Sequence, residues 1–168
     1  MNIEIRNITK TYGNLKANDS VSLQIPSGMI LGILGENGAG KSTLMKILSG
    51  LISADDGEIL VDGQPVTINS PEDAINLGIG MLHQEPRDFP SMSIMDDLRI
   101  GALNHPGKQK NIDLEELRGL ASSLGFSLDF NGLVRKLTVG ERQELELVRL
   151  LYFGVQVLIL DEPTTGIS

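Results

Sequence analysis

Two stretches near the start of the chain alternate apolar and polar residues, which predicts strands with one buried face. These are residues 2–8 and 20–25. A turn at Pro26-Ser27-Gly28 then leads into a continuous apolar run at residues 29–34, which predicts a strand buried on both faces, as in a parallel sheet. By the same reasoning, further strands are expected at residues 58–61, 66–68, 78–82 and 155–160.

The pattern changes to helical spacing between the last two of these strands. Helices are predicted at residues 93–102, 113–124 and 140–152. Another short helix is predicted after Ser70, which suits an N-cap, because Pro71 fits the first helical position. The sequence therefore predicts one α/β domain over residues 1–168, with a helical subdomain at about residues 87–150.

Residues 35–43 read Gly-Glu-Asn-Gly-Ala-Gly-Lys-Ser-Thr and match the phosphate-loop pattern G-x-x-x-x-G-K-[ST]. A chance match on an ordinary strand–turn–helix is the weaker explanation, because a predicted strand precedes the loop and a predicted helix follows it. Lys41 is expected to reach the β- and γ-phosphates of a nucleotide, and the Ser42 hydroxyl to ligate Mg²⁺. The predicted nucleotide-binding residues of the loop are Gly35, Glu36, Asn37, Gly38, Ala39, Gly40, Lys41, Ser42 and Thr43.

Two acidic residues, Asp161 and Glu162, directly follow the strand predicted at residues 155–160. Because open α/β sheets bind ligands at the carboxyl ends of their strands, both carboxylates are expected at the nucleotide site. Asp161 is the candidate for holding Mg²⁺ through water, and Glu162 for polarising the attacking water. Without the phosphate loop, an acidic pair that merely ends a strand would be the better explanation.

The composition narrows the classes of partner. The net charge is −8, which argues against nucleic acid as the main partner, because a nucleic-acid backbone needs a basic face. The chain has no cysteine, which excludes disulfides and thiolate metal sites. It also lacks a run of about 18 apolar residues that would predict a membrane span.

Five segments, in order along nearly the whole chain, resemble the ATPase subunits of ABC transporters. They are residues 11–13, 35–43, 83–85, 137–143 and 158–163. Residues 78–84, 137–146 and 158–164 are most similar to the branch that imports simple sugars and nucleosides. The resemblance implies a P-loop NTPase fold of the α/β class, with a RecA-like parallel core, an antiparallel β-subdomain and a helical subdomain.

The resemblance also implies roles for residues outside the phosphate loop. Tyr12 matches an aromatic residue that stacks on adenine, which a ring does without hydrogen-bond specificity. Gln84 matches a glutamine that contacts Mg²⁺ or the attacking water through its amide oxygen, and His83 beside it is expected to be a neighbour only. The implied catalytic residues are Lys41, Gln84 and Glu162, and the implied Mg²⁺ ligands are Ser42, Gln84 and Asp161.

Residues 137–141 occupy the place of the family's signature, usually L-S-G-G-Q. Thr138 keeps a hydroxyl, Val139 replaces the first glycine, Gly140 keeps the second, and Glu141 replaces the glutamine. The resemblance implies that Thr138, Val139, Gly140 and Glu141 contact ATP held by a partner subunit, at the N-terminus of the helix that follows. A helix N-terminus that Thr138 simply caps explains the same residues locally about as well.

Taken together, the resemblance implies a subunit that binds ATP and Mg²⁺ and hydrolyses ATP to power an importer of a sugar or nucleoside. ATP would lie between the phosphate loop of one subunit and the signature of a second, in a head-to-tail dimer. Transmembrane permease subunits would hold this dimer at the cytoplasmic face of the membrane, and other subunits would select the transported substrate. Because the sequence ends at Ser168, before a switch histidine, we expect the chain to be C-terminally truncated and a weak ATPase by itself.

Two other functions stay open. One is an ABC protein that acts on ribosomes or DNA, for which tandem ATPase domains or a coiled coil would be expected, and the sequence contains neither. The other is a fragment that binds nucleotide or a partner without hydrolysis.

Overall fold

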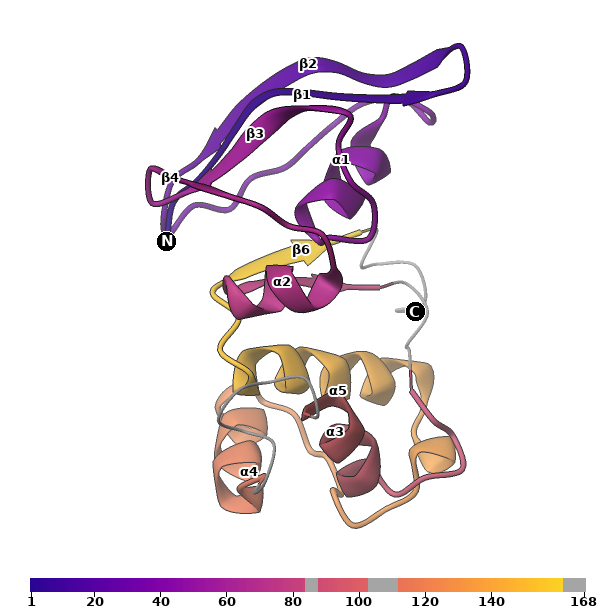
Figure 1. The fold of residues 1–168 in the computed structure, drawn as a ribbon. Coiled ribbons are helices and arrows are strands. Elements are labelled where there is room, and N and C mark those ends of the chain that lie inside the picture. Colours follow the sequence, from indigo (N-terminus) through magenta and orange to yellow (C-terminus); the bar gives the residue numbers. More distant parts are fainter. Residues whose placement is uncertain (84–87, 103–111, 162–168) are drawn as a thin grey trace. The chain divides into compact units, whose positions relative to one another are not determined.

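The computed structural model describes residues 1–83, 88–102 and 112–161. The chain forms two compact units, Met1–Ile79 and Gly80–Ser168 (Figure 1). The first unit is built on a four-stranded antiparallel sheet, and the second contains a helical cluster and a two-stranded sheet.

The antiparallel sheet of the first unit has the strand order β2-β1-β3-β4. Its strands are β1 (Ile3–Tyr12), β2 (Leu15–Ile25), β3 (Asp56–Val61) and β4 (Gln64–Val66). The predicted strands are confirmed, although β1 and β2 are longer than predicted and β4 lies earlier in the chain. Asp62 (φ 48°) and Gly63 (φ 79°) connect β3 to β4, and a two-residue hairpin turn favours these positive φ angles.

A bulge in β1 corrects the simple alternation that the sequence predicts. Ile5 pairs with Leu23 and Ile8 with Val21, so between these two pairs β1 contains one residue more than β2 does. Asn7 takes up the extra residue with a φ of 52°. The bulge therefore turns Ile8 towards the core, where only 1% of its surface is exposed.

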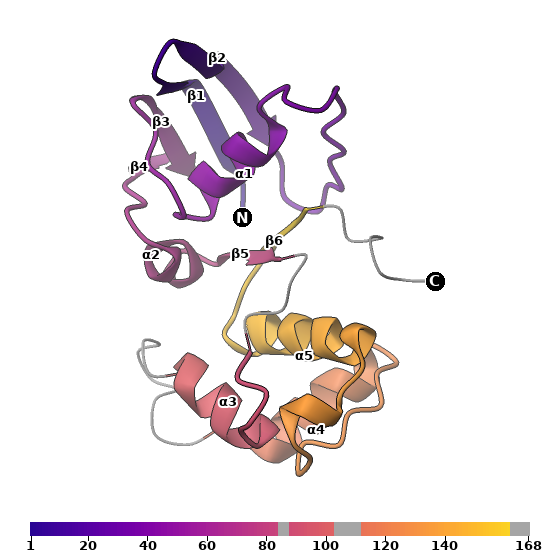
Figure 2. The ribbon, with the colours of Figure 1, turned by 90° about the vertical axis from the view of Figure 1, so that its right-hand side faces the viewer.

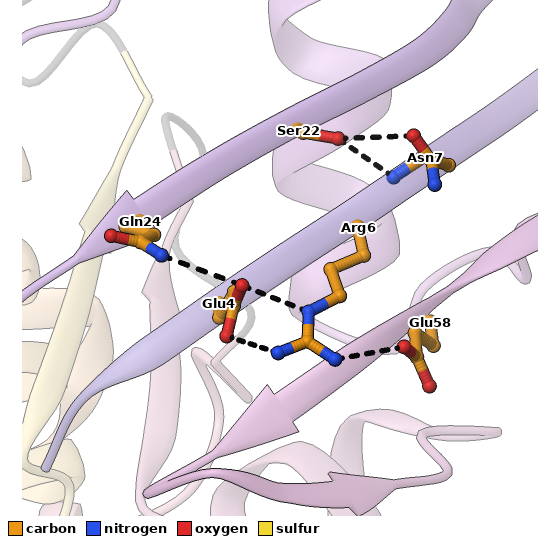
Figure 3. A network of polar contacts seen from close by, with 6 residues as sticks. All are labelled: Glu4, Arg6, Asn7, Ser22, Gln24 and Glu58. Atoms are coloured by element: carbon orange, nitrogen blue, oxygen red, sulfur yellow. Dashed lines mark hydrogen bonds and ion pairs between the residues drawn. The ribbon is translucent and has the colours of Figure 1, made fainter.

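A polar network covers the other face of this sheet (Figure 3). The Arg6 guanidinium donates two hydrogen bonds to the Glu4 carboxylate and one to Glu58, and Gln24 also donates to Glu4. The bonds to Glu4 and Glu58 raise the pKa of Arg6, and the hydrogen bonding from Arg6 lowers the pKa of Glu4. Because the pairs lie at the solvent surface, they make this face polar and add little to stability.

Two helices of the first unit follow the sheet strands and the phosphate loop. Helix α1 (Lys41–Leu48) lies alongside the sheet in both views (Figures 1 and 2). Its buried apolar residues are Leu44, Ile47 and Leu48. Helix α2 (Pro71–Asn76) starts as predicted, because the Asp73 N–H donates to the Ser70 hydroxyl at 3.1 Å.

The strand predicted at residues 29–34 is wrong. These residues form no regular strand, and Ile30 and Leu34 are 101% and 95% exposed. A strand needs a hydrogen-bonded neighbour, and the sheet of the first unit does not include this segment. An apolar run indicates surface that favours burial, but it does not supply the neighbouring strand that burial requires.

The sheet of the second unit pairs β5 (Ile79–Leu82) with β6 (Val157–Leu160), and both strands were predicted. Gly80 allows β5 to pack closely. A Cβ atom at this position would lie 2.8 Å from Val155 Cγ2 and 3.1 Å from Leu150 Cδ2. Gly80 therefore lets β5 approach the segment that leads into β6, which would otherwise have to shift.

The helical cluster of the second unit consists of α3 (Ile94–Ala102), α4 (Leu114–Ser123) and α5 (Val139–Tyr152), with a 3-10 turn at Val134–Lys136 (Figure 2). All three predicted helices are confirmed. Their shared core residues are Ile94, Leu98, Leu117, Ala121, Phe130, Val134, Leu145, Val148 and Tyr152. Within the described ranges, none of the helices combines the length and apolar character that a membrane span requires.

Two ion pairs connect α5 to the chain at the start of the helical cluster. Arg149 pairs with Asp97 of α3, whose side chain is 1% exposed. The other carboxylate oxygen of Asp97 accepts the Phe89 N–H at 2.9 Å. Arg142 pairs with Asp88 at 3.3 Å. Asp88 is therefore paired directly with the first turn of α5, and Phe89 is linked to Arg149 of α5 through Asp97.

Candidate functional site

Two glycines of the phosphate loop, just before α1, have a backbone conformation that few other residues adopt. Gly38 has a φ of 84° and Gly40 a φ of 87°. Between them, the Ala39 N–H donates to the Glu36 carbonyl at 3.1 Å, which closes a turn. The loop thus curls back just before α1 begins at Lys41.

The N-terminus of α1 has no side-chain cap. Gly40 is the N-cap residue, and the first turn contains no acidic residue. The first N–H groups of a helix have no partner within the helix and carry partial positive charge. This terminus is therefore suited to bind an anion.

Lys41 folds over the loop that precedes it. Its Nζ atom donates to the Gly35 carbonyl at 2.7 Å and to the Glu36 carbonyl at 2.9 Å. An ammonium group has three N–H donors, so one more is left for an anion. The two bonds hold the positive charge against the part of the loop that precedes α1.

Strand β2 contacts the phosphate loop at Gly40. The buried Asn18 side chain donates from Nδ2 to the Gly40 carbonyl at 3.2 Å. A Cβ atom at Gly40 would lie 2.0 Å from the Ala17 carbonyl oxygen, so no side chain fits there. Sequence reasoning missed Asn18. The signal that could have indicated it is a polar residue, Asn18, within a stretch that forms a strand, β2.

The other residues predicted in the loop lie just before α1 or in its first turn. Ser42 is exposed at the second position of α1, and Thr43 beside it is half-buried. The exposed loop residues before α1 are Gly35, Glu36, Asn37, Gly38 and Ala39. The Ser42 hydroxyl is therefore open to a cation that accompanies a bound phosphate.

Tyr12 lies at the end of β1, in the first unit, and is 49% exposed. Its cross-strand partner is Leu15, which is 65% exposed. The Lys10 ammonium lies 5.8 Å from the centre of the Tyr12 ring. An exposed ring beside an apolar side chain can receive a planar base by stacking.

Gln84 and Glu162 were predicted for catalysis and Asp161 as a Mg²⁺ ligand, and of these three only Asp161 belongs to the described ranges. It directly follows β6 and is half-buried. Gln84 and Glu162 lie outside the described residues. The described residues contain no group of three or more His, Asp or Glu side chains that could hold a metal ion. The predicted Mg²⁺ ligands within the described ranges, Ser42 and Asp161, carry oxygen donors, the type of ligand that Mg²⁺ prefers.

The predicted signature, residues 138–141, forms the start of α5. The Thr138 N–H donates to the Glu141 carboxylate at 2.7 Å, and the Glu141 N–H donates to the Thr138 hydroxyl at 3.2 Å. These two bonds make a complete capping box, and the first of them lowers the pKa of Glu141. Val139 is 56% exposed. The capping that explains the sequence locally is therefore present in the structure.

Residues 18–165 match the family described as "ABC transporter". Among curated proteins, the nucleoside import ATP-binding protein NupA of Lactococcus lactis subsp. cremoris is 41% identical over 170 residues. The ribose import ATP-binding protein RbsA of Yersinia pestis is 39% identical over 168 residues. Each similarity covers 99% of this chain and 33% of the relative, so the chain spans about a third of the length of these relatives.

Solved structures of similar fold agree with this match. A nucleotide-free ATP-binding cassette from an ABC transporter has a TM-score of 0.83 and 25% identity, covering 100% of this chain and 72% of that one. The ADP conformation of MJ1267, also an ATP-binding cassette of an ABC transporter, has a TM-score of 0.83 and 26% identity, covering 100% and 71%. The predicted fold class is confirmed: a P-loop NTPase of the α/β class, with a RecA-like parallel core, an antiparallel β-subdomain and a helical subdomain.

Proposed function

Because the chain belongs to the ABC transporter family, we propose that it is the ATP-binding part of a longer protein that hydrolyses ATP to drive transport. The observation that carries this proposal is the start of α1. There the left-handed Gly40, the uncapped helix terminus and the Lys41 ammonium meet, without an acidic residue in the first turn. The phosphate chain of a nucleotide matches such a site, because its oxygens accept several N–H donors at once.

The binding roles follow from the chemistry of each group. The loop amides of residues 35–43 hold the phosphates, and Lys41 neutralises their charge. The exposed Tyr12 ring stacks on adenine. A bound Mg²⁺ would neutralise charge on the phosphate oxygens, and we assign Ser42, Asp161 and Gln84 as its protein ligands.

Catalysis then consists mainly of positioning. Glu162 accepts a proton from the attacking water or orients it, and the Gln84 amide contacts the same water. Lys41 and the loop amides stabilise the charge that develops on the transferred phosphoryl group. These roles belong to the complete protein, since the present chain spans about a third of its relatives.

The partners we propose are a second ATPase subunit and transmembrane permease subunits. Two subunits would bind ATP head to tail, so that residues 138–141 of one face the phosphate loop of the other. The permease would hold them at the cytoplasmic face of the membrane. A sugar or a nucleoside is the proposed cargo, because NupA is described as a nucleoside importer component and RbsA as a ribose importer component. The net charge of −8 argues against nucleic acid as a partner.

The experiment that tests this function replaces Glu162 by Gln in the complete protein. We expect Mg-ATP to bind as in the wild type, because the amide keeps the shape of the carboxylate. Phosphate release should fall, because the amide does not accept the proton. ATP-dependent dimers should accumulate and be visible by size-exclusion chromatography. Wild-type turnover in this variant would refute the role of Glu162.

A second measurement compares the 168-residue chain with a version extended to the length of its relatives. We expect Mg-dependent phosphate release to be much slower in the shorter chain. Equal rates in both, abolished in both by Glu162→Gln, would show that the shorter chain is already a complete ATPase.

A further inference from the structure

We propose that Asn18 is a positioning residue for nucleotide phosphates, which acts through the peptide bond between Gly40 and Lys41. This inference rests on the proposed ATP-binding function. Asn18 lies in β2 and is 5% exposed, so its side chain does not itself face a ligand in solution. Its effect on a phosphate would be transmitted by the loop backbone that it holds.

The hydrogen bond has only one chemically reasonable direction. The Asn18 side chain meets the carbonyl oxygen of Gly40, which is an acceptor. The amide nitrogen Nδ2 must therefore face that oxygen, at 3.2 Å, because two oxygens would repel each other. The Gly40 carbonyl also accepts the Leu44 N–H at 3.0 Å, which is the first helical bond of α1. Two donors from different elements thus fix this carbonyl.

Fixing the carbonyl also fixes the N–H of Lys41. A trans peptide unit is planar, and its C=O and N–H point in opposite directions. The Gly40 carbonyl points towards β2 and the body of α1, so the Lys41 N–H points out of the helix terminus. This N–H is one of the donors that a helix leaves without an internal partner. Asn18 therefore sets the direction of a donor at the candidate phosphate site.

Stability alone does not explain an asparagine at this position. The Oδ1 atom of Asn18 is buried and has no hydrogen-bond partner within the described part of the chain. A buried acceptor without a partner is unfavourable, and an apolar side chain of similar size would avoid that cost. The Ala17 carbonyl already restricts position 40 to glycine, and α1 already provides one bond to the Gly40 carbonyl. What the Asn18 bond adds is a second, lateral restraint on the peptide plane.

The proposal predicts that loss of the Asn18 hydrogen bond affects binding of the phosphates and does not affect binding of the base. In a phosphate loop the backbone N–H groups hold the α- and β-phosphates, whereas the base binds elsewhere. Loss of the Asn18 donor should therefore weaken binding of ADP and of pyrophosphate. Binding of adenosine should stay the same, because adenosine has no phosphate for this peptide to hold.

The experiment uses the 168-residue chain and three ligands: Mg-ADP, magnesium pyrophosphate and adenosine. Competition against a fluorescent ADP analogue gives a dissociation constant for each. One variant is Asn18→Leu, which has a side chain of similar size without a donor. The other is Asn18→Ala, which also lacks the donor and whose smaller side chain fits if leucine does not. Ile5→Val is the matched control. It removes one buried methyl group from the core of the same sheet and leaves the residues of β2 and of the loop unchanged. Thermal unfolding is followed for all proteins.

We expect the two Asn18 variants to bind Mg-ADP and pyrophosphate about tenfold more weakly, as loss of one hydrogen bond would give. Adenosine affinity should stay within twofold or so of the wild type. Ile5→Val should lower the melting temperature without this ligand dependence. Unchanged pyrophosphate affinity in both Asn18 variants, or equal loss for adenosine and pyrophosphate, would overturn the proposal.

A separate arm distinguishes failure of the positioning role from failure of the proposed function. Wild-type chain and Lys41→Ala are titrated with Mg-ADP under the same conditions. If the wild type binds and Lys41→Ala does not, while the Asn18 variants match the wild type, only the role of Asn18 is refuted. If the wild type binds no better than Lys41→Ala, the nucleotide site itself is refuted.

Discussion

The two helices that begin at predicted phosphate contacts, α1 and α5, start in opposite ways. Helix α1 follows Gly40, which has a left-handed backbone, and has neither a side-chain cap nor an acidic residue in its first turn. Helix α5 follows Thr138, which forms a complete capping box with Glu141. Two short sequences that resemble phosphate-binding motifs thus give one terminus with open donors and one whose donors are partly occupied.

The difference shows that a helix N-terminus is an anion site only if its own side chains leave it open. At α1, the positive Lys41 adds to the partial charge of the terminus. At α5, the Glu141 carboxylate already accepts the Thr138 N–H, and its negative charge opposes an approaching phosphate. The role proposed for residues 138–141 towards a partner's ATP therefore requires this capping box to rearrange or to be shared.

The two regions also differ in what holds them together. The α1 region depends on backbone conformation, since glycines and carbonyl contacts define the loop. The α5 region depends on side chains, since Arg142 and Arg149 pair with carboxylates and Thr138 provides the cap. The folding of the loop before α1 should therefore be sensitive to added atoms, and the stability of α5 to removed side chains.

The largest effect is expected for Asp97→Ala, in the α5 region. Asp97 is buried and pairs with Arg149, whose other ion pair among the described residues is with Glu146, at 3.1 Å. Loss of one partner from a buried pair costs about 3–5 kcal/mol, because the other charge stays desolvated. Urea unfolding of the chain, followed by circular dichroism, measures this change in the free energy of unfolding.

The matched control for Asp97→Ala is Glu115→Ala. Glu115 pairs with Arg118 on the surface of α4, where its side chain is 83% exposed. A surface pair of this kind contributes about 0–1 kcal/mol. Similar losses in the two variants would mean that the Asp97–Arg149 pair is no more important than a surface contact.

Next in size is Gly40→Ala, in the α1 region. A Cβ atom would overlap the Ala17 carbonyl oxygen at 2.0 Å, and a φ of 87° strains any residue with a side chain. Strain and overlap together should cost about 3 kcal/mol and displace the loop from β2. Gly38→Ala is the control, because its φ of 84° is similar but nothing lies within 4 Å of its Cβ position.

For these two glycine variants, the free energy of unfolding and the affinity for Mg-ADP are both measured. Gly38→Ala should show only the strain, about 1 kcal/mol. Gly40→Ala should show the overlap in addition and lose nucleotide binding. Equal effects of the two substitutions would show that the contact with β2 does not constrain the loop.

The same contrast explains what could be predicted from the sequence. The phosphate loop and the cap at Ser70 were predicted because each depends on residues a few positions apart. The bond from Asn18 to Gly40 joins residues 22 positions apart and exists only because β2 passes below the loop. Local patterns do not contain that information.

Burial was predicted less well than the positions of strands and helices. Residues 29–34 were expected in a buried strand, but no strand of the first unit pairs with them. The alternation at residues 2–8 gave β1 correctly and missed its bulge, because Asn7 takes a positive φ that many residues avoid. A sequence pattern indicates which surface favours burial, whereas the partner that buries it depends on the fold.

A third prediction concerns Lys41→Ala, which removes the ammonium that is bonded to the phosphate loop. We expect the affinity for Mg-ATP to fall about 100-fold, as loss of a charge-assisted hydrogen bond would give. Lys46→Ala is the control, because Lys46 is exposed in the last turn of the same helix. Equilibrium binding of labelled ATP decides the matter. Unchanged affinity in Lys41→Ala would mean that the loop is not the nucleotide site.

A smaller effect is expected for Thr138→Ala, which removes the cap of α5. The Glu141 N–H then loses its acceptor, and the helix should lose about 1 kcal/mol. Thr138→Ser keeps the hydroxyl and should retain most of the stability. Urea unfolding of both variants measures the difference. Equal losses in the alanine and serine variants would show that the methyl group, rather than the cap, is what matters.

The smallest effect concerns the charge of Glu141 and its dependence on pH. The Thr138 N–H donates to the Glu141 carboxylate and lowers its pKa below the ordinary value of 4.5. A lowered pKa in the folded state means that the ionised group stabilises the fold above the unfolded pKa. This contribution is lost as the pH falls through the folded pKa. Glu141→Gln keeps an acceptor oxygen but has no charge, so it should not share this dependence.

The measurement is the difference in unfolding free energy between wild type and Glu141→Gln, from pH 7 down to about pH 3. The difference cancels the titration of Glu4, Asp55 and Asp96, whose pKa values are also lowered and which both proteins contain. We expect a constant advantage of the wild type above about pH 5, which shrinks at lower pH. A difference that does not change with pH would show that the α5 cap works through hydrogen-bond geometry alone. The negative charge of Glu141 would then not stabilise α5. It would still repel a phosphate that approaches the start of this helix.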